Sequence, residues 1–235
     1  MSIQWDDLAV TAEQMRDMDD RAVTDYGVQL IQMMENAGRH LAELTRRQLA
    51  GIIAGKSILV LCGSGNNGGG GMVASRHLQN WGARVQVLLA ASAARLKPIP
   101  AQQWKTVSAL GLAVESPTHP TDLIIDALLG YGGSGNPRPP IDNWINFAND
   151  SGSPILSLDI PSGLNATTGE PGSHCVRATV TLTLALPKTG LLQKRAEPYV
   201  GELYLCDIGI PPQVYKGLFP NIKLSNLFHQ AELLN

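Results

Sequence analysis

The sequence is short of aromatic residues, net charge and cysteine, and it has no long apolar segment. A formal net charge of −2 without a basic cluster argues against nucleic-acid binding. Cys62, Cys175 and Cys206 cannot all pair with one another, so we expect reduced thiols and a cytoplasmic location. The apolar runs have strand length and the amino-terminal residues are acidic. We therefore expect neither a membrane span nor a secretory signal.

The apolar residues that are present are mostly Leu, Ile, Val and Ala, which suits strands buried between helices. Hydrophobic residues make up 44% of the 235 residues, enough for one substantial core, so we expect one domain over residues 1–235. Residues 11–49 have apolar residues at helical spacing, which predicts two helices. Thr11 is the expected amino-terminal cap of the first helix, and Gly27 separates it from the second.

From residue 57 onward, apolar strands alternate with helices. Buried strands separated by helices predict an α/β fold, in which a mainly parallel central sheet is covered by helices on both faces behind an amino-terminal helical segment. The expected strands are residues 57–62, 83–89, 122–130, 154–159, 178–187 and 201–211, and the expected helices are residues 72–82, 101–112 and 141–152.

The first strand runs into the glycine-rich stretch "GSGNNGGGG", residues 63–71. Such a stretch is either a turn that needs positive φ or a backbone cradle for a phosphate, and the number of glycines with two asparagines favours the cradle. The spacing Gly63-x-Gly65-x-x-Gly68 matches the dinucleotide fingerprint. That fingerprint expects an acid about 20 residues later, where this sequence reads "VQVLLAASAARL". The missing acid argues against an ordinary dehydrogenase.

Other polar residues follow the predicted strands, at the sheet edge where open α/β sheets bind ligands. Asp126 and Asp159 each end an apolar run, where a carboxylate serves as a base, a metal ligand, a hydroxyl acceptor or a cap. Lys188 follows another strand and either binds an anion or is a solvated strand end. The five histidines have no metal-binding spacing.

Seven motifs in order make the sequence resemble the YjeF N-terminal domain family, the NAD(P)H-hydrate epimerases, over residues 11–211. They are "EQMRDMDDRA", "MMENAGR", "GSGNNGGGG", "DALLGYGGSG", "LDIPSGLNATTG", "LPKTGLL" and "GELYLCDIGIP". The resemblance implies a Rossmann-like fold and interconversion of the R and S forms of NADH or NADPH hydrated at C6. It also implies a homodimer and, because no dehydratase domain follows in the sequence, a separate dehydratase partner.

The resemblance also implies roles for individual residues. Asp159 would contact the substrate near its reacting portion, and we expect it to be the acid/base, with Lys188 as second choice. Oxygen-bearing residues would hold a potassium ion, namely Asn67, Asp126 and Ser162. Two loops would bind the rest of the substrate: Asn66, Asn67, Gly68, Gly69 and Gly70, then Gly130, Tyr131, Gly132, Gly133, Ser134, Gly135 and Asn136.

Two positions depart from the family pattern, which usually has Asp in place of Gly70 and of Asn165. A lost charge-assisted hydrogen bond at position 70 is worth about 1.5–3 kcal/mol, roughly one to two decades in affinity. The departures favour an alternative, a catalytically weak or inactive nucleotide-binding or scaffold module. The enzyme is favoured by the retained polar residues, namely Asn67, Asp126, Asp159 and Ser162.

Overall fold

The computed structural model describes residues 5–117, 120–133, 135–218, 227–228 and 231–235, so Ser134 of the second predicted loop lies outside it. Its sheet has eight strands in the order β3-β2-β1-β4-β5-β6-β7-β8. Neighbouring strands are parallel except for β7 and β8, which are antiparallel. The strands are β1 (Ser57–Cys62), β2 (Arg84–Leu89), β3 (Ala113–Val114), β4 (Leu123–Ala127), β5 (Ile155–Leu158), β6 (Val180–Leu184), β7 (Glu202–Cys206) and β8 (Leu233–Leu234).

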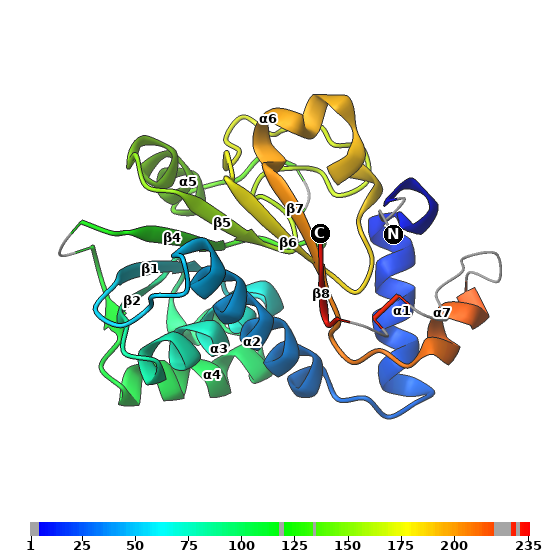
Figure 1. The fold of residues 1–235 in the computed structure, drawn as a ribbon, viewed down its shortest axis with the longest axis horizontal. Helices are drawn as coiled ribbons and strands as arrows, with labels where there is room; N and C mark the ends of the chain where they lie inside the picture. Colours follow the sequence, from blue (N-terminus) through cyan, green and yellow to red (C-terminus); the bar gives the residue numbers. More distant parts are fainter. Residues whose placement is uncertain (1–4, 118–119, 134, 219–226, 229–230) are drawn as a thin grey trace.

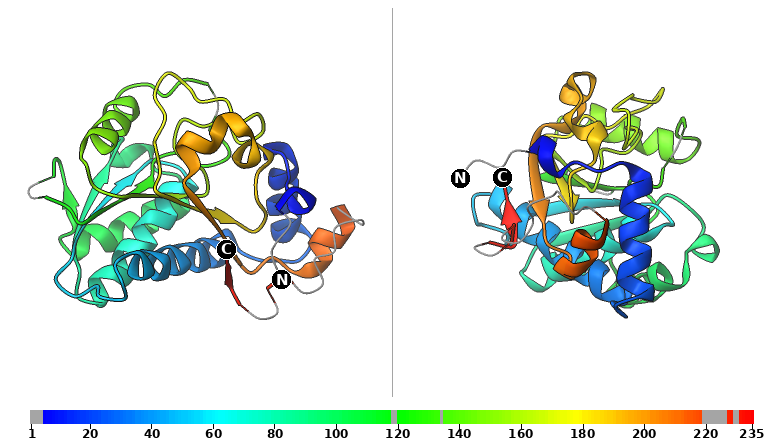
Figure 2. Two further views of the ribbon diagram at one scale, coloured as in Figure 1. Left: turned by 45° about the horizontal axis from the view of Figure 1, so that its top comes forward. Right: turned by 90° about the vertical axis from the view of Figure 1, so that its right-hand side faces the viewer.

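Helices cover both faces of the sheet (Figure 1). One layer holds α2 (Leu30–Gln48), α3 (Asn66–Asn80) and α4 (Pro98–Ala109), and the other holds α5 (Ile141–Asp150) and the short α6 (Glu197–Val200). The helices α1 (Ala12–Thr24) and α7 (Pro212–Leu218) pack together beside one end of the sheet (Figure 2). Short 3-10 helices are η1 (Trp5–Leu8), η2 (Ala93–Arg95), η3 (Thr189–Leu192) and η4 (Lys194–Ala196). The predicted three-layer α/β fold is confirmed.

The central strand β1 is apolar at every position from Ile58 to Cys62, and its packing explains this. Ile58 and Val60 belong to the core on the side of α2 and α3, whereas Leu59 and Leu61 pack with Ile145 of α5 on the other side. All five side chains are fully buried. Because successive side chains of a strand point to opposite faces, a strand covered on both faces is apolar at every position.

The predicted start of α1 is confirmed in atomic detail. The Thr11 hydroxyl accepts a hydrogen bond from the Gln14 N–H, and the Gln14 side chain accepts one from the Thr11 N–H. This reciprocal pair satisfies two backbone donors that a helix start leaves unpaired. Gly27 has a φ of 70° and lies between the two helices, as the sequence predicted.

The glycine-rich stretch is mainly the first turns of a helix, because α3 begins at Asn66 rather than at the predicted Met72. None of its glycines has positive φ. A Cβ on Gly68 would meet the carbonyl of Gly63, and one on Gly71 would lie 2.7 Å from the Cβ of Ala127. The glycines therefore let α3 pack against the ends of β1 and β4.

Two short edge strands, β3 and β8, were not predicted from the sequence. The strand β8 lies in the polar tail, where Leu233 and Leu234 pair with Cys206 and Leu205 of β7. The predicted strands over 122–130, 178–187 and 201–211 are shorter in the structure and continue as loops. None of the described helices is long and apolar enough to cross a membrane.

The chain changes direction across the sheet between β1 and β4. The strand β1 pairs with β2 on one side and with β4 on the other. The helix after β1, α3, lies in one layer, and the helix after β4, α5, lies in the opposite layer. The loops that leave these strands therefore diverge, and the crevice between them is the usual ligand position in open α/β sheets.

Candidate active site

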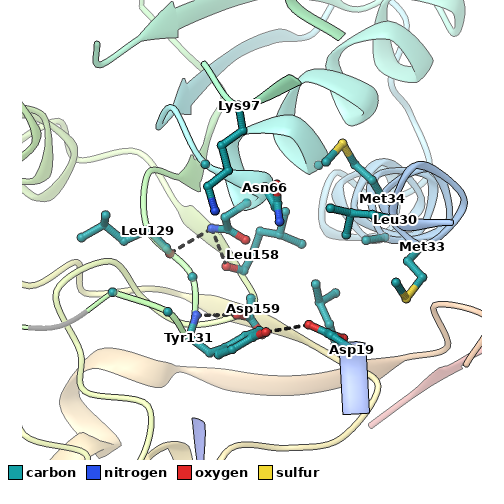
Figure 3. Close-up of a pocket in the computed structure, with 18 of the residues that line it drawn as sticks. Asp19, Leu30, Met33, Met34, Asn66, Lys97, Leu129, Tyr131, Leu158 and Asp159 are labelled. Atoms are coloured by element: carbon teal, nitrogen blue, oxygen red, sulfur yellow. Dashed lines mark hydrogen bonds between the residues drawn. The ribbon is translucent and has the colours of Figure 1, made fainter. Parts of the chain in front are cut away.

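A cavity of about 510 Å³ opens at this crevice, and we call it the central cavity. The loops after β1, β4 and β5 form one side, and α1 and α2 form the other (Figure 3). Figure 3 shows Lys97 and Asn66 near one end of the cavity, with Tyr131, Asp159 and Asp19 toward the other. The cavity thus combines an apolar wall with few polar groups, as small-molecule sites usually do. The apolar wall includes Leu30, Met33, Met34, Ala37, Leu128, Leu129 and Leu158.

Asp159 is held in a fixed position where β5 ends. Its φ is 69°, a conformation that few residues other than glycine adopt and that is found repeatedly at active sites and ligand-binding loops. Oδ2 accepts a hydrogen bond from the Tyr131 N–H at 2.7 Å, and Oδ1 lies 2.6 Å from Nζ of Lys188. Among the described residues Oδ1 accepts no hydrogen bond, so it keeps the capacity to accept one from a ligand.

Lys188 lies behind Asp159 and is fully buried. Its ammonium group donates a hydrogen bond to the Leu184 carbonyl at 2.9 Å and a longer one to the Thr183 hydroxyl at 3.4 Å. It also lies 5.8 Å from the centre of the Tyr131 ring. Lys188 is not among the residues that line the central cavity. It therefore orients Asp159 and does not itself face a ligand there.

Tyr131 connects Asp159 to a second carboxyl group, that of Asp19 on α1. The Tyr131 hydroxyl donates a hydrogen bond to Oδ2 of Asp19 at 2.6 Å. Burial raises the pKa of Asp19 to about 6, although this hydrogen bond and the Lys188 charge act in the opposite direction. Burial also raises the pKa of Tyr131, so its hydroxyl keeps its proton. Asp19 and Asp159 both line the cavity, one with a raised pKa and the other ion-paired.

Asp126 lies beneath the cavity as a fully buried carboxylate with four hydrogen bonds. The donors are the Ser157 hydroxyl at 2.8 Å, the Leu128 N–H at 3.2 Å, and the Ser162 N–H and hydroxyl at 2.9 and 2.6 Å. Burial raises the pKa of Asp126 and these bonds oppose the rise. The Ser162 hydroxyl also accepts from the Leu129 N–H at 2.8 Å. Asp126 thus ties together the loops after β4 and β5.

Asn67 joins the same two loops from the α3 side. Its side-chain amide donates to the carbonyl oxygens of Leu129 and Leu158, at 2.9 and 3.1 Å (Figure 3). Among the described residues, no group of three or more His, Cys, Asp or Glu side chains is placed to hold a metal ion. The oxygens around Asn67 are of another type, carbonyls beside the Ser162 hydroxyl. In the structure the amide nitrogen of Asn67 faces these carbonyls. The opposite orientation of the amide would turn its oxygen toward them and give an all-oxygen set of the kind that a hard cation prefers.

The structure brings most of the predicted substrate residues together. Gly68 and Gly69 are packed inside α3, and Asp126, Ser162 and Lys188 lie behind the cavity wall. Gly135 and Asn136 line a smaller pocket of about 170 Å³ that shares Gly130 and Gly133 with the central cavity. The predicted residues that line the cavity itself are Asn66, Asn67, Gly70, Gly130, Tyr131, Gly132, Gly133 and Asp159.

Several cavity residues were not predicted from the sequence. Arg16 and Asp19 come from α1, and Lys97 precedes α4. From α2, the buried side chains of Met33 and Met34 belong to the core and also form part of the cavity wall. The single sequence signal for Asp19 was its place in the "EQMRDMDDRA" motif.

The two departures from the family pattern have different surroundings. Asn165 accepts hydrogen bonds from the N–H groups of Thr167 and Thr168, both at 2.9 Å. An amide oxygen fixes this turn as a carboxylate would, so Asn165 fills a structural role. Gly70 lines the central cavity, and a Cβ there would lie 2.8 Å from Cδ2 of Leu158. Gly70 therefore faces the central cavity, whereas Asn165 lines only the smaller adjoining pocket.

The sheet is mainly parallel, and the cavity opens where the loops after β1 and β4 diverge, beside the start of α3. This combination defines a Rossmann-like nucleotide-binding protein. A family model described as "YjeF-related protein N-terminus" matches residues 30–190, and the chain belongs to this family.

Two relatives match this chain over most of their own length, and a third is much longer. An NAD(P)H-hydrate epimerase of Dehalogenimonas lykanthroporepellens is 43% identical over 210 residues, which cover 88% of this chain and 84% of the relative. An NAD(P)H-hydrate epimerase of Rhodopirellula baltica is 36% identical, covering 88% of this chain and 86% of the relative. A "Bifunctional NAD(P)H-hydrate repair enzyme Nnr" of Moorella thermoacetica is 36% identical over 87% of this chain but only 41% of its own length.

A solved structure has the same fold. The crystal structure of the yeast protein YNL200c superimposes with a TM-score of 0.80, covering 97% of this chain and 99% of that chain at 24% sequence identity. A coverage of 97% extends the match beyond residues 30–190 of the family model on both sides.

Proposed function

We propose that this protein is an NAD(P)H-hydrate epimerase, an isomerase that interconverts the R and S forms of NADH or NADPH hydrated at C6. The observation that carries the proposal is the pair of carboxyl groups in one cavity, Asp159 ion-paired with Lys188 and Asp19 with a pKa raised to about 6. Two carboxyl groups in unlike environments are suited to separate acid and base roles. The relatives from Dehalogenimonas and Rhodopirellula, both named as this epimerase, support the same conclusion.

The chemistry needs one proton given and one taken. In the hydrate, the C6 carbon that bears the hydroxyl is bonded to the ring nitrogen N1. Protonated Asp19 gives its proton to this hydroxyl, and the lone pair of N1 then expels it as water. The ring is left with an iminium-like carbon at C6. A water molecule then adds to the opposite face of C6, and Asp159 takes its proton. In the reverse direction the steps run backwards, so protonated Asp159 gives the proton and Asp19 takes one. Proton exchange with solvent resets the two carboxyl groups between turnovers.

The remaining residues position these groups. Lys188 and the Tyr131 N–H fix the Asp159 carboxylate from two sides, at 2.6 and 2.7 Å. The Tyr131 hydroxyl orients Asp19. Met33, Met34 and Leu158 form the apolar wall, which limits the water near the ring and strengthens the electrostatic interactions in the cavity.

We also propose a potassium site at Asn67, Asp126 and Ser162, with the carbonyl oxygens of Leu129 and Leu158. A cation there would brace the loops after β4 and β5 and supply positive charge near the substrate's phosphates. The test compares the thermal unfolding temperature of the protein in potassium chloride and in choline chloride at equal ionic strength. The wild type unfolds at a higher temperature in potassium, and Asn67→Leu loses this difference. Equal unfolding temperatures for the wild type would reject the site.

The assembly and the reaction sequence are further proposals. A dehydratase that accepts only the S form would consume the product of this enzyme and restore NADH or NADPH. We propose that it is a separate protein that works with this one in the cytoplasm. We also propose a homodimer, for which light scattering coupled to size-exclusion chromatography is the test. A single species at the monomer mass, 25.1 kDa, would contradict it.

Gly70 favours a second candidate function, a module of the same family that binds the nucleotide with weak or no catalysis. The test for both uses a purified single epimer of hydrated NADH, with chromatography to separate the R and S forms. The epimerase brings that epimer to the equilibrium mixture faster than buffer alone. Binding of NADH or NADPH without faster equilibration would favour the second candidate.

A further inference from the structure

A second, wider depression lies beside the central cavity, and we call it the outer groove. It is an open groove of about 1020 Å³ beside the carboxyl ends of β2 and β3. Its apolar surface includes Leu89, Val114 and the indole rings of Trp104 and Trp144. The outer groove and the central cavity share Ser64 and Ile141, so the two are continuous.

The central cavity offers groups for one half of a dinucleotide. Asp159 and Asp19 occupy the end where we place the nicotinamide ring, whereas Gly65 and Asn66 present the start of α3 near the other end. A helix start binds phosphate through its free N–H groups, and Lys97, which also lines the cavity, adds positive charge. A pyrophosphate there would leave the second nucleoside to extend past Ser64. That direction leads into the outer groove.

We propose that the outer groove binds the adenosine half of the substrate and that Arg95 recognises a 2′-phosphate on its ribose, which makes hydrated NADPH the preferred substrate. The proposal rests on the proposed function for the identity of the substrate. It adds the position of the second nucleoside and the choice between the two cofactors.

The residues that follow β2 decide between NADH and NADPH in sheets of this type. An acid at that position accepts hydrogen bonds from the free ribose hydroxyls, whereas an arginine binds a 2′-phosphate. Here β2 is followed by Ala90 and Ala91, and Arg95 ends the 3-10 helix η2. The acid that lines the groove, Glu115, follows β3 rather than β2.

Charge in the groove agrees with a phosphate ligand. Arg95 comes from the β2 side and Arg138 from the loop after β4, so two positive charges face one negative charge, Glu115. Within the part of the chain that the structure describes, neither arginine has an ion-pair partner. An arginine can bind a phosphate through two parallel hydrogen bonds.

The first test measures binding of two probes that lack the nicotinamide, ADP-ribose and its 2′-phosphate, by isothermal titration calorimetry. We expect the wild type to bind the phosphorylated probe roughly tenfold or more tightly than ADP-ribose, because one charge-assisted hydrogen bond contributes about that much to affinity. Arg95→Ala removes this ratio, because it weakens binding of the phosphorylated probe far more than binding of ADP-ribose. Arg84→Ala, which removes the same charge at the opposite end of β2, keeps the ratio. Equal affinities for the two probes in the wild type would overturn the proposal.

The second test places the adenine by tryptophan fluorescence. Binding of the phosphorylated probe quenches emission, and Trp104→Phe or Trp144→Phe reduces the quenching. The control is Trp81→Phe, because the Trp81 ring lies 6.0 Å from that of His77 and 5.4 Å below Arg46, outside the groove. Quenching that only Trp81→Phe abolishes would place the adenine elsewhere and overturn the proposal.

Epimerisation rates distinguish a failure of the groove assignment from a failure of the proposed function. If the wild type epimerises both hydrates and Arg95→Ala leaves their ratio of kcat/KM unchanged, the groove assignment is wrong and the epimerase stands. If the wild type epimerises neither hydrate while the probes bind as expected, the epimerase is wrong and the groove stands. We expect Arg95→Ala to lower kcat/KM for hydrated NADPH roughly tenfold more than kcat/KM for hydrated NADH.

Discussion

Lys188 and Asp159 form an ion pair inside the protein, with 2.6 Å between Nζ and Oδ1 and with side chains that are 0% and 3% exposed. Such a pair adds little to stability compared with apolar residues, but removal of one partner leaves an uncompensated buried charge. The pair also fixes a carboxylate at the edge of a cavity, on a residue with positive φ. The main role of the ion pair is therefore to hold the Asp159 carboxylate in place rather than to stabilise the fold.

Lys188→Met tests this relationship. We expect the variant to lose about 3–5 kcal/mol of unfolding free energy, because Asp159 stays buried without its partner. At a temperature where the variant is folded, kcat falls and KM changes little, since Lys188 orients a reacting group but does not contact substrate. Urea denaturation and steady-state kinetics give both values.

Two controls accompany that prediction. Asp159→Asn combined with Lys188→Met removes both charges, so it regains stability over Lys188→Met alone but stays inactive. Arg195→Met breaks the exposed pair of Arg195 and Glu170 and costs less than about 1 kcal/mol. A Lys188→Met variant with wild-type kcat would refute the positioning role.

Asp19 makes the activity depend on pH. If it donates the proton, kcat/KM corrected for the uncatalysed rate falls as pH rises through about 6, the pKa of its carboxyl group. Asp19→Asn keeps an acceptor for the Tyr131 hydroxyl but has no acidic proton, so it is less active and its rate does not fall across that range. The same fall in Asp19→Asn as in the wild type would show that another group is responsible.

The raised pKa of Asp19 also affects stability. Between about pH 4 and pH 6 the folded protein keeps a proton that the unfolded chain releases, so the unfolding free energy falls as pH rises across this window. The effect amounts to about 1–3 kcal/mol. Asp19→Asn cannot ionise, so it is more stable than the wild type at about pH 7 and similar to it near pH 4. Thermal unfolding at both pH values tests this, and an equal difference at both would contradict it.

The sequence was sufficient to predict the sheet and much of the cavity edge. β1 and β4 are apolar because both of their faces are covered, and Asp159 follows an apolar run. Asp19 was not predicted because α1 lies far from β5 in the sequence, and only the fold brings Tyr131 between them. The start of α3 was misplaced because glycine normally disfavours a helix, whereas here the close packing of Gly68 against Gly63 requires it.

Gly70→Asp restores the carboxylate that the family usually has. The new Cβ would lie 2.8 Å from the end of the Leu158 side chain, which can rotate away. We expect KM for the hydrates to fall roughly tenfold or more, because a carboxylate accepts a charge-assisted hydrogen bond from a ribose hydroxyl. Gly70→Ala has the same contact without the charge, so its KM does not fall. Equal KM values for Gly70→Asp and Gly70→Ala would show that the carboxylate has no role here.

The most direct test of the proposed function compares the wild type with Asp159→Asn in the epimerisation of a purified single epimer of hydrated NADPH. The variant keeps the size of the side chain and an acceptor for the Tyr131 N–H, and circular dichroism checks its fold. We expect the wild type to equilibrate the R and S forms at least about a hundredfold faster than the variant, the usual contribution of an acid/base group. A folded Asp159→Asn protein that equilibrates them at the wild-type rate would contradict the assignment.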